Sequence, residues 1–224
     1  MKGLFITGTD TGVGKTVVSC SLAAAFARRG HTVGVMKPCE TGDGDDAARL
    51  IAATGRPLPL GDVSPYRFAL PASPEVAALA AGATIDLTRI LESFETIARG
   101  SDMTLVEGAG GLLVPLGAGR NMADLARRLG LPIVIVARPS LGTVNHTLLT
   151  IEAARRRGLR VLGVILSRTR EPAEPDEPSN PVAIARYGEV PILGTLPRLP
   201  SDDLSQLAEA AERHLALDRL LSLL

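Results

Sequence analysis

A glycine-rich turn that closes on Gly-Lys-Thr follows a short apolar run close to the start of the chain. The apolar run covers residues 4–7, and the turn leads through three glycines to Lys15 and Thr16. In phosphate-binding loops, glycines let backbone N–H groups surround phosphate oxygens, the lysine reaches the outer phosphates and the hydroxyl ligates Mg²⁺. A helix that begins near Lys15 would add the positive end of its dipole. The segment therefore predicts a strand, a phosphate-binding loop and a helix in succession.

The loop departs from the strict phosphate-loop pattern at one position. That pattern requires glycine at position 9, where Thr9 stands, and the nearest glycine is Gly8. The alternative is that Gly8, Gly12 and Gly14 only punctuate a tight turn between a strand and a helix. The apolar run before the loop, the apolar helical pattern after it and the Gly-Lys-Thr ending favour phosphate binding.

Apolar, β-branched runs alternate with helical patterns along the chain of 224 residues. The runs cover residues 4–7, 32–36, 103–106, 132–137, 161–166 and 191–196. Such alternation is typical of a parallel sheet. We therefore expect an α/β fold, with a doubly wound, mainly parallel sheet that carries helices on both faces, as in P-loop NTPases. We expect one domain over residues 1–224, because 46% hydrophobic residues supply a large core.

Glycines and prolines mark the ends of the predicted helices and one long loop. The helices are expected to end in left-handed glycines at Gly30, Gly55, Gly100, Gly130 and Gly158. Residues 171–181 are rich in proline and acidic side chains, which predicts an exposed loop.

The charge balance and hydropathy pattern argue against nucleic-acid and membrane partners. The chain has 24 basic and 24 acidic residues and no long basic block that could follow a phosphate backbone. Its N-terminal apolar run is too short for a signal peptide, and no run approaches the ~20 residues of a membrane-spanning helix. We therefore expect a cytoplasmic protein.

Other common site signatures are absent from the sequence. Cys20 and Cys39 form no Cys-x-x-Cys pair, so we expect both to be small packed side chains. The three histidines are too scattered for a zinc site, and no serine lies in a Gly-x-Ser-x-Gly elbow.

Glu107 directly follows the third apolar run and precedes glycines at positions 108, 110 and 111. In doubly wound sheets, ligands bind beyond the carboxyl ends of the strands. A carboxylate there suits Mg²⁺, which prefers a few hard oxygen ligands together with water and substrate phosphates. We therefore predict that Thr16 and Glu107 bind the metal. The alternative for Glu107 is a helix-capping or salt-bridged acid.

Lys37 ends the second apolar run, and Pro38 stops the chain from continuing directly into a helix. A second lysine beside a phosphate loop suits stabilisation of a transferring phosphoryl group, although a solvated strand-end charge is the simpler interpretation. The acidic residues Asp43, Asp45 and Asp46 follow one loop later. They could cap a helix that begins near Ala47, or supply a metal ligand.

Four segments together resemble the dethiobiotin synthetase family. They are GTDTGVGKT at residues 8–16, Lys37-Pro38, VEGAGG at 106–111 and LGTVNH at 141–146, and the match extends to about Thr195. The loop of that family carries the same displaced first glycine. The resemblance implies a homodimeric, Mg²⁺-dependent enzyme that forms the ureido ring of dethiobiotin from 7,8-diaminononanoate, CO₂ and a nucleoside triphosphate. The implied intermediates are a carbamate and then a phosphorylated carbamate, from which the second amine displaces phosphate.

The resemblance also implies roles for individual residues. Lys37 and Lys15 would be catalytic, and Thr16, Asp46 and Glu107 would hold Mg²⁺. The nucleotide, ATP or another nucleoside triphosphate, would contact Gly12, Val13, Gly14, Lys15, Thr16, Asp46, Glu107, Gly108, Ala109, Gly110, Ser167, Arg168, Leu196, Pro197 and Arg198. The diamine would contact Thr11, Lys37, Thr41, Gly111, Leu141, Gly142, Thr143 and Asn145. Of these, the helix start at 142–145 would reach the substrate carboxylate from the partner subunit.

Two positions differ from many members of that family. Ser167 and Arg168 stand where an Asn-Asp pair reads adenine, which predicts weak discrimination among nucleotide bases. Asn180 falls near the place of a tyrosine that helps to bind the substrate carboxylate, and Tyr187 lies further on. The substrate tail is therefore expected to be held differently.

Three other functions are alternatives to this interpretation, and the sequence argues against two of them. A partner-controlled ATPase switch of the partitioning type shares the sheet and the loop, but it carries a second lysine where Asp10 stands. The amide-forming ligases of cobalamin synthesis carry an additional glutaminase domain, for which a chain of 224 residues has no room. The third alternative is a nucleotide-binding module without catalysis.

Overall fold

The computed structural model describes residues 2–170, 177–199 and 203–224. Its centre is a six-stranded sheet in the order β10-β9-β8-β1-β5-β2, and all neighbouring pairs are parallel. The strands are β1 (Lys2–Gly8), β2 (Val33–Met36), β5 (Met103–Gly111), β8 (Ile133–Ala137), β9 (Val161–Ser167) and β10 (Ile192–Leu196). All six predicted apolar runs are strands, and the predicted doubly wound α/β fold is confirmed.

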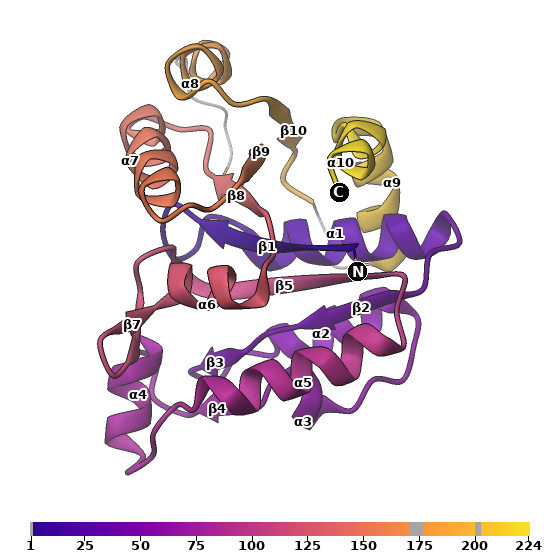
Figure 1. Ribbon diagram of the computed structural model, residues 1–224. Helices are drawn as coiled ribbons and strands as arrows, with labels where there is room; N and C mark the ends of the chain where they lie inside the picture. The colour runs from indigo at the N-terminus through magenta and orange to yellow at the C-terminus, as the bar shows by residue number, and fades with distance from the viewer. Residues whose placement is uncertain (1, 171–176, 200–202) are drawn as a thin grey trace.

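Helices cover both faces of this sheet (Figure 1). One face carries α1 (Lys15–Arg28), which packs against α2 (Asp46–Thr54) and α9 (Leu204–His214). The other carries α5 (Leu87–Arg99), α6 (Met122–Leu129), α7 (Thr143–Arg156) and α8 (Asn180–Gly188). The β1-to-β2 crossover runs in one direction along the sheet and the later crossovers run in the other. Because such crossovers are right-handed, reversing the direction changes the face.

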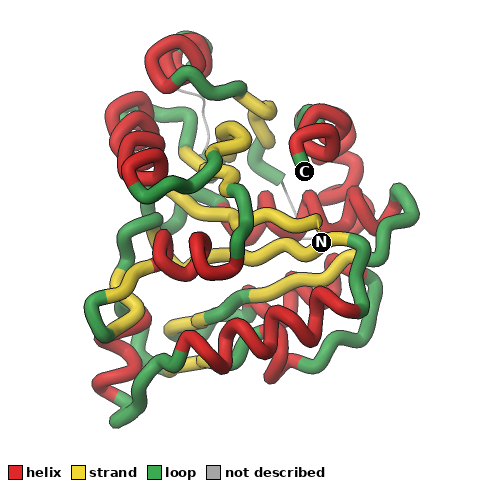
Figure 2. The backbone as a smooth tube through the Cα atoms, viewed as in Figure 1, coloured by secondary structure: helices red, strands yellow, loops and turns green. Residues whose placement is uncertain are grey.

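Two short strand pairs lie near the carboxyl ends of the strands, and three further short helices complete the fold. A parallel pair joins β3 (Cys39–Thr41) to β4 (Tyr66–Phe68), and an antiparallel pair joins β6 (Pro115–Gly117) to β7 (Arg120–Asn121). The remaining helices are α3 (Leu60–Val63), α4 (Pro74–Ala80) and α10 (Leu217–Leu223). Figure 2 shows loops leaving the sheet at its edge away from the N-terminus, where β1 and β5 end. This edge is where the site is expected.

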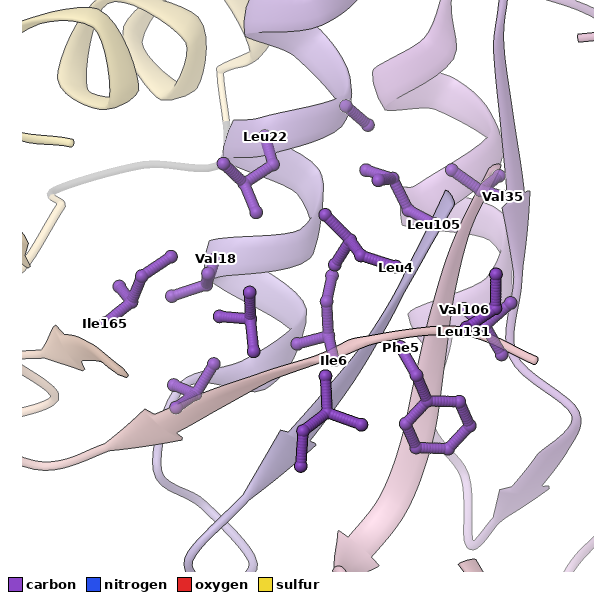
Figure 3. Packing of buried hydrophobic residues seen from close by; sticks show 14 of the residues in the cluster. Leu4, Phe5, Ile6, Val18, Leu22, Val35, Leu105, Val106, Leu131 and Ile165 are labelled. Carbon is purple, nitrogen blue, oxygen red and sulfur yellow. The ribbon is translucent and has the colours of Figure 1, made fainter. Parts of the chain in front are cut away.

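The central strand β1 is buried on both sides. Leu4, Phe5 and Ile6 are fully buried, and they pack with α1 and the neighbouring strands in one continuous core (Figure 3). A strand with helices on both of its faces needs an unbroken apolar run, which is why residues 4–7 show no alternation. The rigid strand fixes the position of the loop that follows it.

Two local predictions need correction. Gly100 has a φ of −99°, because its N–H bonds to Ile97 and its carbonyl accepts from Arg56, so α5 ends without a left-handed residue. The glycines at 30, 55, 130 and 158 do have positive φ. The predicted exposed loop 171–181 is wrong at its end, where Glu177 is buried and Asn180 begins α8. Residues 171–176 lie outside the described part.

No helix within the described ranges is long and apolar enough to cross a membrane.

Candidate active site

The loop between β1 and α1 has the backbone conformation of a phosphate-binding loop. Gly12 and Gly14 have φ values of 73° and 90°, in the left-handed region that favours glycine. A side chain at Gly14 would also collide with Ser167 of β9. The ammonium of Lys15 folds back and donates to the carbonyl oxygen of Asp10 at 3.0 Å. Burial lowers the pKa of Lys15 to about 8, although Glu107 acts in the opposite direction.

Lys37 lies between two carboxylates opposite this loop. Its Nζ donates to Oδ2 of Asp46 and to Oε1 of Glu107, both at 2.5 Å. The hydroxyl of Thr16 donates to the same Glu107 oxygen at 2.9 Å. The structure therefore brings together Lys37 directly after β2, Glu107 of β5 and the starts of α1 and α2. The prediction that Glu107 stands at a strand end is wrong, because β5 continues to Gly111 through its pairing with β1.

Electrostatic coupling sets the charge state of this cluster. Burial lowers the pKa of Lys37, but Glu107 and Asp46 outweigh burial and raise the pKa above its ordinary value. Burial raises the pKa of Asp46, but Lys37, the Thr16 hydroxyl and Arg49 together lower it. Asp46 is therefore ionised and Lys37 protonated at neutral pH. Oε2 of Glu107 is buried and has no hydrogen-bond partner among the residues that the structure describes.

A cavity of about 380 Å³ lies between the loop and this cluster. Many of the residues that line it were predicted from the sequence to belong to the site. They are Thr11, Gly12, Gly14, Lys15, Thr16, Lys37, Thr41, Asp46, Glu107, Ala109 and Gly110. Sequence reasoning gave no site role to Val17, Cys39, Arg49 and Thr169, which also line it. Strand alternation was a usable signal for Cys39, since it shares a face with Thr41. Burial raises the pKa of its thiol to about 12, and Cys20 is buried in the core as predicted.

Some predicted nucleotide residues lie elsewhere. A side chain at Gly108 would meet the ring of Phe5 at 2.9 Å, so this glycine is needed for core packing, and it does not line the cavity. Val13 is buried. The guanidinium of Arg168 is engaged within the protein, because it donates to Glu177, with the shorter contact at 2.5 Å. The segment Leu196, Pro197 and Arg198 does not line the cavity, although the Leu196 carbonyl accepts from the backbone N–H of Arg168.

Thr11 connects this cavity to three neighbouring ones. One of about 390 Å³ contains Thr41, Gly110 and residues 71–74. Another, also of about 390 Å³, contains Gly12, Arg138 and Leu141. A third of about 480 Å³ contains Gly111 and residues of α7 such as His146. The predicted substrate residues Thr41, Gly111 and Leu141 thus line cavities that share Thr11, but each lies in a different neighbouring cavity.

The start of α7 does not line the Lys37 cavity of its own chain. Gly142 is the N-cap with a φ of 88°, and Leu141 before it is 80% exposed. Gly142, Thr143 and Asn145 line none of these four cavities of the described chain. Asn180, near the place of the family tyrosine, donates from Nδ2 to the Pro139 carbonyl at 2.6 Å, and Tyr187 is largely exposed.

The acidic residues after β3 have separate environments. Asp45 is the N-cap residue of α2 but makes no side-chain capping bond, and Asp43 is exposed. Only Asp46 faces the cavity. Within the described ranges, no three His, Cys, Asp or Glu residues form a metal-binding group. The available oxygen donors are two carboxylates and the Thr16 hydroxyl, a small set of the kind Mg²⁺ uses together with phosphates and water.

A sheet with the strand order found here, a phosphate loop after β1 and a lysine–carboxylate cluster beyond it define a nucleotide-dependent P-loop protein. The family model described as an AAA domain matches residues 2–205. A protein from Anaeromyxobacter dehalogenans (strain 2CP-C) named ATP-dependent dethiobiotin synthetase BioD is 47% identical over 214 residues, covering 94% of this chain and 95% of its own. One of the same name from Bacillus velezensis is 37% identical, covering 100% and 98%. The chain belongs to the dethiobiotin synthetase family and is an ATP-dependent ligase.

Solved structures of cell-division ATPases share the fold. MinD from Pyrococcus furiosus matches with a TM-score of 0.62 at 18% identity, covering all of both chains. The MinC:MinD complex from Aquifex aeolicus also gives 0.62, at 17% identity, covering 100% of this chain and 96% of that one. At such identity the likeness concerns the fold alone. In place of the second loop lysine of partitioning ATPases stands Asp10, whose carboxylate accepts from Thr11 N–H at 2.7 Å.

Proposed function

We propose that this chain forms the ureido ring of dethiobiotin in the cavity between Lys15 and Lys37. One amine of 7,8-diaminononanoate attacks CO₂ and loses a proton, which gives a carbamate. A carbamate oxygen then attacks the γ-phosphorus of the nucleotide and expels the nucleoside diphosphate. The second amine attacks the activated carbon, the ring closes and phosphate leaves. The observation that carries this proposal is the buried Lys37 ammonium between two carboxylates, opposite the phosphate loop.

The two lysines have different tasks in this scheme. Lys15 can turn from the Asp10 carbonyl to the outer phosphates, because its present bond is to a neutral acceptor. Lys37 remains protonated and stabilises negative charge on the carbamate and the transferring phosphoryl group. Its raised pKa argues against a role as general base. Thr41, which lines the same cavity, hydrogen-bonds the diamine.

Mg²⁺ is the metal that this donor set fits. Thr16, Asp46 and Glu107 would hold it, and the unpartnered Oε2 of Glu107 is a buried acceptor that a cation would satisfy. When bound, the metal neutralises charge on the nucleotide phosphates. Lys37 lowers the pKa of Asp46, so this carboxylate needs no proton loss before it binds the cation.

The substrate site is completed by a second copy of the chain. The Gly142–Asn145 helix start does not line the Lys37 cavity of its own chain, which supports a contribution across a twofold interface. Its N–H groups suit the substrate carboxylate. The position of Asn180 supports the expectation that the carboxylate tail is held without the family tyrosine. A cytoplasmic location stays a prediction.

The direct test is to incubate the protein with 7,8-diaminononanoate, bicarbonate, Mg²⁺ and ATP and to measure dethiobiotin by mass spectrometry. We expect product with the native protein and with Lys2→Ala, in which an exposed lysine is lost, and far less with Lys37→Ala. Nucleotide binding without any dethiobiotin would contradict the proposal and favour a nucleotide-binding module.

A further inference from the structure

Glu40 points away from the cavity that its neighbours line. Side chains alternate along β3, so Cys39 and Thr41 face the cavity and Glu40 lies on the opposite side of the strand. Glu40 is only 5% exposed, and a carboxylate is rarely this buried unless it is paired. Its Oε1 accepts a hydrogen bond from the backbone N–H of Ala47 at 3.2 Å. Its Oε2 lies 3.7 Å from Nε of Arg67, its register partner on β4.

The bond to Ala47 replaces a cap that α2 lacks. Asp45 occupies the N-cap position but makes no capping bond through its side chain. Ala47 is the second residue of α2, and an N–H at that position has no acceptor inside the helix. An N-cap side chain normally accepts from this position. Glu40 supplies the acceptor from a neighbouring strand, and its negative charge suits the positive end of the helix dipole.

The capped turn contains Asp46, whose carboxylate faces the cavity. Asp46 is the first residue of α2, and Oδ2 of its side chain lies 2.5 Å from Nζ of Lys37. The loop before it contains Gly42, with a φ of 83°, and Gly44. Glycine restricts the backbone least of all residues, so this loop by itself does little to fix the first turn of α2. The Glu40–Ala47 bond ties this turn back to β3.

We propose that Glu40 is a positioning residue that holds Asp46 in place to bind the divalent cation. This inference rests on the proposed function, in which Asp46 is a metal ligand. Glu40 itself touches neither metal nor substrate, and it acts through the hydrogen bond to the Ala47 N–H. The essential property is an acceptor oxygen at the end of a side chain of this length. The negative charge is secondary, because the Arg67 contact is long and half exposed.

The test compares Mn²⁺ binding to the whole protein in the presence of ADP, measured by electron paramagnetic resonance. Glu40→Ala should raise the Mn²⁺ Kd about tenfold, as losses of outer partners of metal ligands do. Glu40→Gln keeps the carbonyl acceptor and the length, so its Kd should stay close to native. Glu40→Asp keeps the charge but is too short, so it should behave like Glu40→Ala, and it carries the test if Glu40→Ala does not fold.

Asp86→Ala is the matched control. Asp86 caps α5 by accepting from the Thr88 N–H at 2.8 Å, away from the cavity, so its loss should lower Tm without changing the Mn²⁺ Kd. Asp46→Asn separates the two proposals. If Asp46→Asn weakens Mn²⁺ binding and neither Glu40→Ala nor Glu40→Asp does, the positioning role is wrong and the metal assignment stands. If Asp46→Asn leaves the Kd unchanged, the metal assignment falls and the Glu40 inference falls with it.

Discussion

The ammonium of Lys37 and the carboxylate of Glu107 form a buried ion pair in which only one oxygen of the acid is used. Nζ lies 2.5 Å from Oε1, and within the described part of the chain Oε2 has no hydrogen-bond partner. The Lys37 side chain is 7% exposed and that of Glu107 is 1% exposed. Leaving one of two such charges buried alone is costly. Glu107 therefore helps to raise the pKa of Lys37 above its ordinary value despite burial and keeps the ammonium protonated, while its own Oε2 is left unused inside β5.

Replacement of Lys37 should affect turnover far more than nucleotide affinity. Lys37→Ala removes the charge that faces the transferring phosphoryl group, so we expect kcat to fall by about 10²-fold or more. Binding of ADP, measured by calorimetry, should change much less because the phosphate loop is untouched. The chain contains three lysines, so Lys2→Ala is a simple control for removing a lysine charge. Near-native kcat in Lys37→Ala would exclude the role in transfer.

The two carboxylates should control the metal dependence. Glu107→Gln and Asp46→Asn keep the shape of each side chain but remove its charge, so the Mg²⁺ concentration for half-maximal activity should rise at least about tenfold. Circular dichroism should show an unchanged fold. Mg²⁺ titration curves that superimpose on the native curve would remove both residues from the metal site.

The nucleotide should bind less tightly as the pH rises through about 8. Burial holds the pKa of Lys15 at about 8, so the free protein loses this ammonium at a pH where an ordinary lysine keeps it. Above that pH, kcat/KM for the nucleotide should fall by up to about tenfold per pH unit. Lys37 should add no inflection in this range, because Glu107 and Asp46 raise its pKa despite burial.

Lys15→Arg provides the control for the pH profile. A guanidinium stays protonated, so the fall near pH 8 should disappear even if the overall activity is lower. The profile is measured from about pH 7 to 9.5 at saturating Mg²⁺. A native profile that is flat over this range would show that Lys15 keeps its proton in the free protein.

The homodimer prediction can be tested by complementation. Lys37→Ala and Asn145→Ala are each expected to be inactive alone, because each site would need Lys37 from one chain and Asn145 from the other. After subunit exchange, mixed dimers contain one intact site, so about a quarter of all sites should recover. Exchange is verified by native mass spectrometry. Mixed dimers without recovered activity would show that Asn145 does not complete the Lys37 site.

The sequence predicts the central sheet and the phosphate loop because both depend on local patterns. Residues 103–106 read as a strand from apolar character alone, and the Gly-Lys-Thr ending specifies its own backbone. Contacts between distant segments leave no such signal. The packing of Gly108 on Phe5 and the pairing of Arg168 with Glu177 depend on how β1, β5 and the segment after β9 meet. For the same reason, the sequence does not predict the cap that Glu40 gives to α2.

The enzyme should discriminate only weakly among nucleotide bases. In place of an Asn-Asp pair, Ser167 is buried behind Gly14 and Arg168 donates its guanidinium to Glu177, so neither side chain is set to read adenine. Arginine has only donors, which suits a carbonyl edge better than the adenine amino group. Loss of one or two base contacts removes about 1–3 kcal/mol of discrimination. We expect kcat/KM values for ATP, CTP, GTP and UTP within a hundredfold of one another when they are measured under the same conditions, since the phosphate contacts of 12–16 ignore the base. A preference for ATP above that range would mean that another element, such as the backbone at 196–198, reads adenine.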